Sequence, residues 1–375
     1  MELNLFLLNN IMGYIYNFSL QLLCIIVLWL SIVKKRELCA KNYKSVGNSL
    51  YVFFGVVLAY ALYTGFGGDD QRYRDFVEGG YVGYYYSDFF SFEELYVIIA
   101  AKTKNFTLWK IVVYGCAVFL SCWSVKKIKV DNLVTLFFFA LIPFSSYGST
   151  RAVLAYSIFL FGYTFLNQKN VLKQIVGLVI VVISWQAHSS MILPILLTPL
   201  TYLKVTKRRF YLLLFLFPVM VVLFNNYYVT FLGSSALENS MAAGKFTIYN
   251  EHGEGTDVST VGGILRFLFG FVIVPPVLLG IKGVYSKTID EKFHRLCKFS
   301  FLMLYVSYVM YFSQLDNITF FNRYFTMIPF YLYIVISGIS LERSVTPSIR
   351  MFYFRFVLAY SIIELLYYFY CFYMV

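Results

Sequence analysis

Residues 11–33 read IMGYIYNFSLQLLCIIVLWLSIV, without a charged residue, and Lys34, Lys35 and Arg36 follow directly. A run of this length can cross the hydrocarbon core of a bilayer as one helix. No basic residue precedes it, which is the reverse of a cleavable signal peptide. Because basic flanks stay on the cytoplasmic side, we expect a retained helix whose N-terminus lies outside.

The composition of the whole chain agrees with that first run. Of 375 residues, 60% are hydrophobic, 21% are aromatic and only 13% are charged. Soluble domains are about 45–50% apolar and about 25% charged, since they must cover their surface with polar groups. The composition therefore predicts an integral membrane protein. It excludes a soluble enzyme, a disordered chain and a secreted disulfide scaffold.

Further apolar runs follow along the chain and predict about twelve transmembrane helices in all. They lie at about 46–64, 106–125, 132–147, 152–166, 174–188, 190–203, 210–231, 263–282, 299–313, 323–341 and 352–372. We expect an all-α, polytopic fold in which residues 1–375 form a single transmembrane domain. The stretch 174–203 is divided in two at Gln186–Ser190, because the basic clusters on both sides of it must stay cytoplasmic.

The net charge of +12 is unevenly distributed over the predicted loops. On this topology, 22 of the 31 lysines and arginines but only five of the 19 acidic residues fall on the cytoplasmic side. This asymmetry sets orientation, so the excess of positive charge indicates topology and no nucleic-acid partner. Both termini are then external.

Three external segments are long enough to contribute to a site: the loops at about 65–105 and 232–262, and the short turn Gln314–Asn322. Within the first, Phe92–Lys102 is apolar but too short to span, which predicts an interfacial or re-entrant helix.

The sequence predicts no metal site, cofactor or disulfide framework. The cysteines lie outside the predicted external loops, at Cys24, Cys39, Cys116, Cys122, Cys297 and Cys371, without the spacing of a metal-binding pair. The chain also has no nucleotide phosphate loop, GxGxxG, HExxH or GxSxG motif. A reaction would therefore draw on the substrate's own bond energy or on a gradient.

Three arginines lie next to apolar runs on the predicted outer side: Arg151, Arg266 and Arg323. A charge near hydrocarbon depth is costly, so such groups usually face a cavity or a partner. Guanidinium groups bind phosphate oxygens in a bidentate manner and keep their charge, which suits a shared diphosphate site. The alternative is that they are anchors reaching the lipid head groups.

His188 lies at the external apex of the divided hairpin, within Trp185-Gln186-Ala187-His188-Ser189-Ser190. It is a candidate general base or hydrogen-bond donor to substrate. A lone histidine is otherwise usually a structural residue.

The tyrosine and phenylalanine excess also has two interpretations. Aromatic belts at both membrane interfaces account for much of it. Tyrosines beside carboxylates in the first external loop, such as Tyr81 and Tyr84, alternatively form a sugar-stacking surface.

Several motifs occur in an order that resembles Wzy-type polysaccharide polymerases, especially the EpsG-like group. An acidic-aromatic segment, Gly68–Phe76, is followed by Phe92-Glu93-Glu94-Leu95-Tyr96. An arginine heading a small-apolar helix comes next, at Arg151–Ala155, and then the His188 motif. Phe321-Asn322-Arg323-Tyr324 completes the series, so that the resemblance covers roughly residues 60–340.

The resemblance implies a location in the bacterial inner membrane and glycosyl transfer at its periplasmic face, in an architecture compatible with GT-C-like glycosyltransferases. The substrates would be oligosaccharide repeat units on undecaprenyl diphosphate, and the lipid diphosphate would leave. A chain-length regulator is a further candidate partner beside the lipid bilayer. The implied roles are catalysis by His188, Asp70 and Glu93, diphosphate binding by Arg151, Arg323 and Arg266, and sugar binding by Tyr73, Tyr84 and Tyr96.

Two other functions fit the same composition. A lipid-linked oligosaccharide flippase also needs about twelve helices and cationic cavity residues, but it should show two related halves. The loops at 65–105 and 232–262 share no pattern. An O-antigen ligase or another membrane transferase would use a lipid donor at an arginine site as well.

Overall fold

In the computed structural model, the described residues are 68–79, 94–128, 150–203 and 206–232, together with 294–296, 298–299, 301–303, 305–306 and 309. All the regular structure in this part of the chain is helical. The described residues fall into two compact units, the first ending at Met191 and the second beginning at Ile192. The prediction of one transmembrane domain over 1–375 is not tested by this division.

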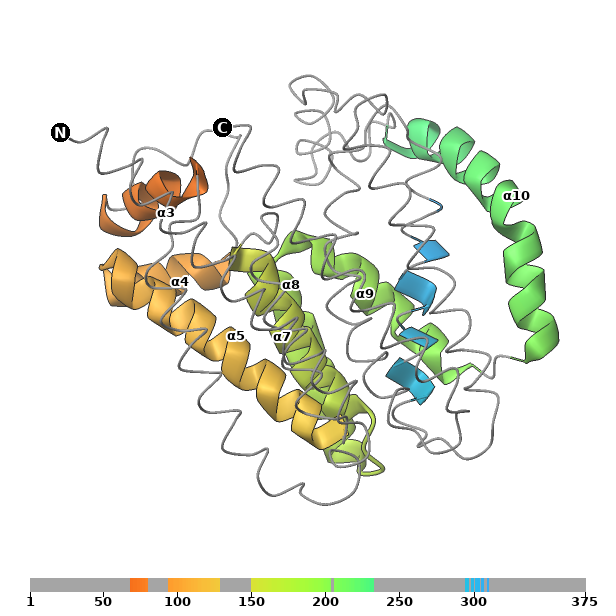
Figure 1. The fold of residues 1–375 in the computed structure, drawn as a ribbon, viewed down its shortest axis with the longest axis horizontal. Helices are drawn as coiled ribbons and strands as arrows, with labels where there is room; N and C mark the ends of the chain where they lie inside the picture. The colour runs from red at the N-terminus through yellow and green to blue at the C-terminus, as the bar shows by residue number, and fades with distance from the viewer. Residues whose placement is uncertain are drawn as a thin grey trace, which may run out of the picture. The chain divides into compact units, whose positions relative to one another are not determined.

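Within the described residues, the first unit contains five helices and a short 3₁₀ turn (Figure 1). They are α3 (Gly68–Glu78), α4 (Glu94–Thr103), α5 (Phe106–Ile128), α7 (Thr150–Leu166), α8 (Val171–Ala187) and η1 (Ser189–Met191). The second unit contains α9 (Ile192–Leu197), η2 (Pro199–Tyr202) and α10 (Lys207–Leu232), and the described residues of 294–309 are also helical.

The prediction of one crossing helix at 190–203 was wrong: this run is divided into η1, the six-residue α9 and η2, with Pro199, which has no backbone N–H to donate, at the start of η2. The run 299–313 is described only in part.

Four other runs agree with the helices. The runs 106–125, 152–166, 174–188 and 210–231 correspond to α5, α7, α8 and α10, each helix being longer than its run or shifted by up to three residues. The predicted short helix at Phe92–Lys102 is found as α4. The runs 11–33, 46–64, 132–147, 263–282, 323–341 and 352–372 lie outside the described residues. Within the described residues, no helix combines the length and hydropathy needed to cross a membrane.

Three of the helices begin at a polar residue that caps them. The side chain of Asn105 accepts the backbone N–H of Leu108 at 2.9 Å, and Asn170 accepts that of Lys173 at 3.3 Å. Thr206 does the same for Arg209 in α10, at 3.3 Å. An N-cap side chain satisfies a backbone donor that has no partner inside the helix, which typically stabilises a helix by about 1 kcal/mol.

The polar helix α3 is amphipathic and packs by its apolar face. Tyr73, Phe76 and Val77 are buried, while Arg74 and Asp75 are exposed. The spacing of three and four residues places the buried side chains on one side of a helix. The sequence analysis assigned this segment only to an external loop, so α3 is an element that it missed.

Helices α5 and α7 run in the same direction. Ser121 donates a hydrogen bond from its hydroxyl to that of Ser157 across the pair, at 2.8 Å. Further along both helices, Trp123 packs on Phe161 and stacks on Phe165 with ring centroids 5.4 Å apart. Residues 128 and 150 therefore lie at opposite ends of this pair.

Helices α7 and α8 form a tight antiparallel hairpin around two glycines. A Cβ atom on Gly162 would lie 2.9 Å from Gly177 O and 2.9 Å from Val181 N. One on Gly177 would lie 2.6 Å from Leu166 N and 2.8 Å from Gly162 O. Contacts this short leave no room for a side chain, so the missing Cβ atoms allow the two backbones to approach closely.

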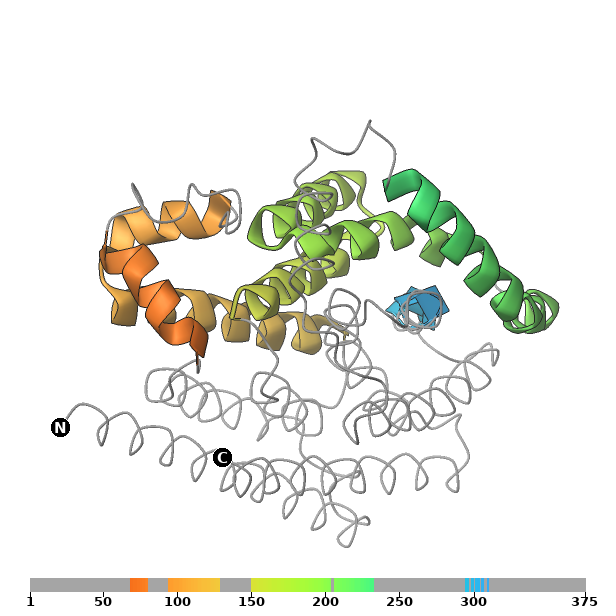
Figure 2. The same ribbon diagram turned by 90° about the horizontal axis from the view of Figure 1, so that it is seen from above.

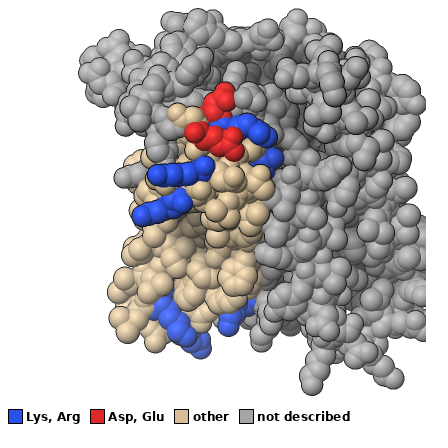
Figure 3. Space-filling model, turned by 90° about the vertical axis from the view of Figure 1, so that its left-hand side faces the viewer, with Lys and Arg blue, Asp and Glu red and all other residues tan. Residues whose placement is uncertain are grey.

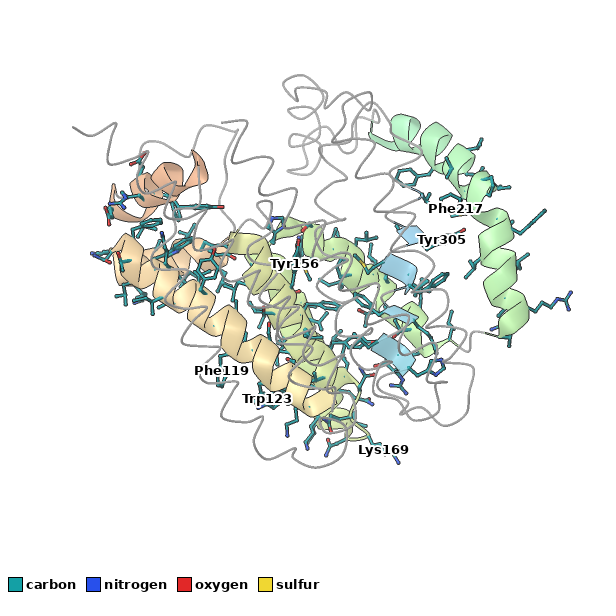
Figure 4. All side chains as sticks on the ribbon, viewed as in Figure 1. Phe119, Trp123, Tyr156, Lys169, Phe217 and Tyr305 are labelled. Carbon is teal, nitrogen blue, oxygen red and sulfur yellow. The ribbon has the colours of Figure 1, made fainter. Side chains whose placement is uncertain are left out.

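The second unit ties two basic segments together. Lys298 Nζ donates to Thr201 O at 3.0 Å and to Leu203 O at 2.9 Å, and the Arg295 guanidinium lies 4.4 Å from the centre of the Tyr202 ring. Further along, Tyr305 donates to Leu213 O at 2.8 Å and packs edge-on against Phe217 (Figure 4). The sequence analysis placed the basic clusters of 204–209 and 282–298 on one side of the membrane, and their described flanks do adjoin.

Candidate functional site

Five of the nine predicted site residues lie on described elements, all in the first unit. Asp70 and Tyr73 are on α3, Tyr96 is on α4, Arg151 is the second residue of α7, and His188 follows the last residue of α8. Glu93, Tyr84, Arg266 and Arg323 lie outside the described residues.

The register of the α7–α8 hairpin brings His188 and Arg151 to the same end. Gly162 lies opposite Gly177, Arg151 comes 11 residues before the first glycine, and His188 comes 11 residues after the second. In antiparallel helices these steps lead in the same direction, by roughly 16 Å at 1.5 Å per residue. The turn η1, which follows His188, accordingly contacts α7.

Helices α3 and α4 lie at this same end of the bundle (Figures 1 and 2). Helix α4 contacts α8 and leads into the start of α5, while α3 contacts both α4 and α5. Since α5 and α7 are parallel, the beginning of α5 lies at the end where α7 begins. Helices far apart in the sequence thus bring Asp70, Tyr73, Tyr96, Arg151 and His188 to one end, which we call the α3/α4 end.

Trp109 on α5 is the centre of an aromatic cluster at the α3/α4 end. Its ring centroid lies 5.5 Å from that of Tyr73, 5.8 Å from that of Tyr96 and 6.1 Å from that of Phe106. Tyr73 is 4% exposed, and Tyr96 and Trp109 are 0% exposed. One face of Tyr73 is covered by the indole, and a sugar-binding role for either tyrosine stays a prediction.

The indole of Trp109 carries a buried donor without an acceptor. Among the described residues, nothing accepts a hydrogen bond from its Nε1. Nearly all buried polar groups in folded proteins have a hydrogen-bond partner, and a buried donor left without an acceptor costs about 1–3 kcal/mol. Such a group is uncommon in a purely structural core. The sequence analysis missed Trp109, because a tryptophan in an apolar run has no distinctive pattern.

Two cations surround the same cluster. Lys110 Nζ lies 4.6 Å and Arg74 Cζ 5.3 Å from the centre of the Phe106 ring. Lys110 is only 5% exposed. The negative face of an aromatic ring attracts cations, more strongly where water is excluded. An acidic side chain also joins α3 to α5 here, since Glu78 Oε1 accepts the backbone N–H of Phe106 at 3.1 Å.

The charged residues around α3, α4 and α5 lie in two separate groups (Figure 3). At the α3/α4 end, Arg74, Asp75, Glu78, Lys102 and Lys104 are exposed. At the other end, Lys127 is exposed, with its Nζ 5.1 Å from the centre of the Trp123 ring. Exposed apolar side chains such as Leu108 and Phe119 lie between the two groups. An uncharged band bordered by charges is typical of a surface that faces lipid.

His188 forms the break between α8 and η1 and is 4% exposed. Its backbone N–H donates to Ser184 O at 3.1 Å and its carbonyl accepts from Met191 N at 3.0 Å. Its ring Nδ1 accepts the backbone N–H of Ser190 at 3.2 Å, and Ser190 Oγ lies 2.6 Å from the same nitrogen. The predicted division of the hairpin at Gln186–Ser190 is therefore found, and Ser190 is a partner that the sequence analysis did not single out.

Comparison with known families identifies the chain. The sequence model of the EpsG family matches residues 48–374.

The chain belongs to the EpsG family. This family is associated with exopolysaccharide biosynthesis, and its proteins are membrane proteins. The match includes every predicted site residue, from Asp70 to Arg323. Comparison with curated proteins and with solved structures gives no match.

Proposed function

We propose that this EpsG-family protein is a polysaccharide polymerase. It joins oligosaccharide repeat units carried on undecaprenyl diphosphate, at the periplasmic face of the inner membrane, with the lipid diphosphate as leaving group. The observation that carries the proposal is the convergence of Asp70, Arg151 and His188 at the α3/α4 end of one helix bundle. A carboxylate or an imidazole can act as the base for the acceptor hydroxyl, and a guanidinium can stabilise the leaving diphosphate.

The chemistry needs no nucleotide and no metal. The acceptor hydroxyl oxygen bonds to the anomeric carbon of the donor, and the bond from that carbon to the diphosphate oxygen breaks with its electron pair on the diphosphate. The hydroxyl proton passes to a general base within hydrogen-bond reach. Asp70, Glu93 and His188 are the candidate bases.

Arginines are proposed to lower the activation barrier by stabilising the leaving group. Negative charge accumulates on the departing diphosphate, and fixed guanidinium groups in a site with little water stabilise it without reorganisation. We assign this role to Arg151, Arg323 and Arg266. Tyr73, Tyr84 and Tyr96 are the proposed sugar-binding residues, and a chain-length regulator is a proposed partner.

The proposed topology has about twelve crossings with both termini outside. The parallel direction of α5 and α7 supports it, because residues 106–125 and 152–166 are both assigned as crossings from outside to inside. Lys127 and Lys169 lie at the end of α5 and α7 away from the α3/α4 end (Figure 4). The site then faces the periplasm, and the lysine end faces the cytoplasm.

Cysteine labelling tests this orientation. In a variant without the native cysteines, Ser240→Cys should react with a membrane-impermeant maleimide on intact spheroplasts, because residues 232–262 are assigned outside. Thr206→Cys should react only after permeabilisation, since Thr206 is exposed but precedes the basic start of α10. Permeabilised samples provide the control that both thiols are reachable. Reaction of Thr206→Cys on intact spheroplasts would refute the orientation.

Deletion of the gene tests the function itself. The surface glycan, separated on a gel, should lose its ladder of long chains and keep a single capped repeat, because export and attachment of one unit need no polymerase. Reintroducing the gene should restore the ladder. Complete loss of the glycan would contradict a polymerase and favour a flippase or a ligase.

A further inference from the structure

Glu78, the last residue of α3, caps a different helix. Its Oε1 accepts the backbone N–H of Phe106, the first residue of α5, at 3.1 Å and across 28 residues of sequence. The first N–H groups of a helix have no partner inside it and carry a partial positive charge, so a carboxylate is a favourable acceptor there. Asn105 accepts the N–H of Leu108 in the same turn, at 2.9 Å. One cap of α5 is thus local, and the other comes from α3.

This hydrogen bond adds a directional contact to the apolar packing of α3. Tyr73, Phe76 and Val77 bury the apolar face of the helix, with Tyr73 on the ring of Trp109. Apolar burial has no preferred direction, so it fixes the rotation of a helix about its own axis less closely than a hydrogen bond does. The bond from Glu78 therefore defines how α3 is placed on the start of α5.

The position of Asp70 depends on this placement of α3. Asp70, Tyr73 and Val77 are related as i, i+3 and i+7, which are positions along one side of a helix. Since Tyr73 and Val77 are buried, position 70 belongs to the side of α3 that packs on the bundle. Asp70 comes eight residues before Glu78, which is roughly 12 Å along the helix axis at 1.5 Å per residue. Any rotation or shift of α3 is therefore passed on to Asp70.

We infer that Glu78 is a positioning residue, which fixes α3 on the start of α5 and thereby holds Asp70 in place as the general base. This inference rests on the proposed polymerase function for the role of Asp70. As the acceptor oxygen bonds to the anomeric carbon, the hydroxyl proton passes to the Asp70 carboxylate, and the electron pair of the broken bond stays on the diphosphate. Glu78 exchanges no proton with the substrate and acts only through the placement of α3.

Two substitutions of Glu78 separate this role from catalysis by Glu78 itself. Glu78→Gln keeps an oxygen that can accept the Phe106 N–H, but an amide cannot act as an acid or a base. Glu78→Ala has no acceptor at all. Asn105→Ala is the matched control, because it removes the other cap of α5 and leaves the bond between α3 and α5 intact.

The activity experiment compares these three variants at matched protein levels in membranes, by pulse-labelling the surface polymer. Glu78→Ala should lose polymer by about 10–10²-fold, because a small misplacement of a catalytic group is sufficient for a loss of this size. Glu78→Gln and Asn105→Ala should both stay near the wild-type level. Normal polymer in Glu78→Ala would overturn the inference. So would an equal loss in Glu78→Gln, which would make the carboxylate itself catalytic, or in Asn105→Ala, which would make the loss an effect of α5 stability.

The placement of α3 is measured independently of any activity. Hydrogen–deuterium exchange of the full chain in lipid nanodiscs, followed by mass spectrometry of peptides covering 68–79, reports how firmly α3 is held. Exchange should be about 5–10-fold faster in Glu78→Ala, and unchanged in Glu78→Gln and Asn105→Ala. Unchanged exchange in Glu78→Ala would overturn the inference even if gene deletion confirms the polymerase. Conversely, an unchanged ladder after gene deletion would refute the polymerase and leave the exchange result standing.

Discussion

Arg151→Ala is expected to abolish long-chain polymer while the protein stays folded in the membrane. Arg151 is the second residue of α7, at the end where the register of the hairpin brings His188. The first turn of a helix also has unpaired backbone N–H groups and a partial positive charge, which favour an anion at the same place. In the proposed role the guanidinium is a bidentate partner of the leaving diphosphate, so its removal should impair the chemistry and not the folding.

The glycan ladder and the amount of protein in membranes measure this result. Arg151→Lys should be only partly active, because an ammonium is a point charge without the planar fork of donors. Lys127→Ala is the matched control, since Lys127 is a cation against an aromatic ring at the opposite end of α5. It should leave the ladder unchanged. We expect Arg323→Ala to behave like Arg151→Ala. Normal ladders from both variants would contradict the diphosphate-binding role and support the alternative, in which these arginines contact lipid head groups.

Gly177→Ala is expected to destabilise the α7–α8 hairpin, although it adds one methyl group. The new Cβ would lie 2.6 Å from Leu166 N and 2.8 Å from Gly162 O, both of them backbone atoms. Backbone atoms of a packed helix cannot move aside as the end of a flexible side chain can. The two helices must therefore separate, at a cost of about 1–3 kcal/mol for an overpacked position. A larger side chain, as in Gly177→Leu, should prevent the hairpin from packing.

Gly115 provides a matched control on the neighbouring helix α5. A Cβ atom there would meet nothing within 4 Å. Gly115→Ala should thus be neutral or stabilising, because alanine favours a helix over glycine by about 0.5–1 kcal/mol. The apparent Tm of the purified proteins compares the two variants, and the ladder reports whether the shift of α8 displaces His188. Equal Tm values for Gly177→Ala and Gly115→Ala would mean that the glycines are not in close contact.

Local patterns were sufficient to predict several elements of the first unit. Helix α7 follows the apolar run 152–166, and the polar residues around His188 correctly predicted where α8 ends. The helical turn at Phe92–Lys102 was found as α4. In each case the signal is a run of apolar residues, or an interruption of one, within about twenty consecutive residues. The pattern of a single helix can be recognised over a window of this length.

Other features could not be predicted in this way, because they depend on residues distant in the chain. The spacing of Tyr73, Phe76 and Val77 is that of a short amphipathic helix, and this pattern could have predicted α3. The segment was assigned to an external loop because it contains many charged residues. Trp109 and Gly177 carry no such signal. Trp109 is the centre of an aromatic cluster only because α3 and α4 pack against it. Gly177 is a site of close helix packing only because the backbone of α7 approaches it.

The sequence by itself determined that this chain is an apolar, basic, helical membrane protein of the EpsG family, and it determined which few charged residues are exceptional. These properties depend on composition and on local periodicity, which determine how the residues partition between water and an apolar environment. Only the tertiary structure decided that the polar α3 lies with α4 at the end of the bundle where α7 begins and α8 ends, and that Glu78 accepts the backbone N–H of Phe106. Close backbone approach and directed hydrogen bonds depend on distances of a few tenths of an ångström between separate segments, and no local pattern encodes such distances.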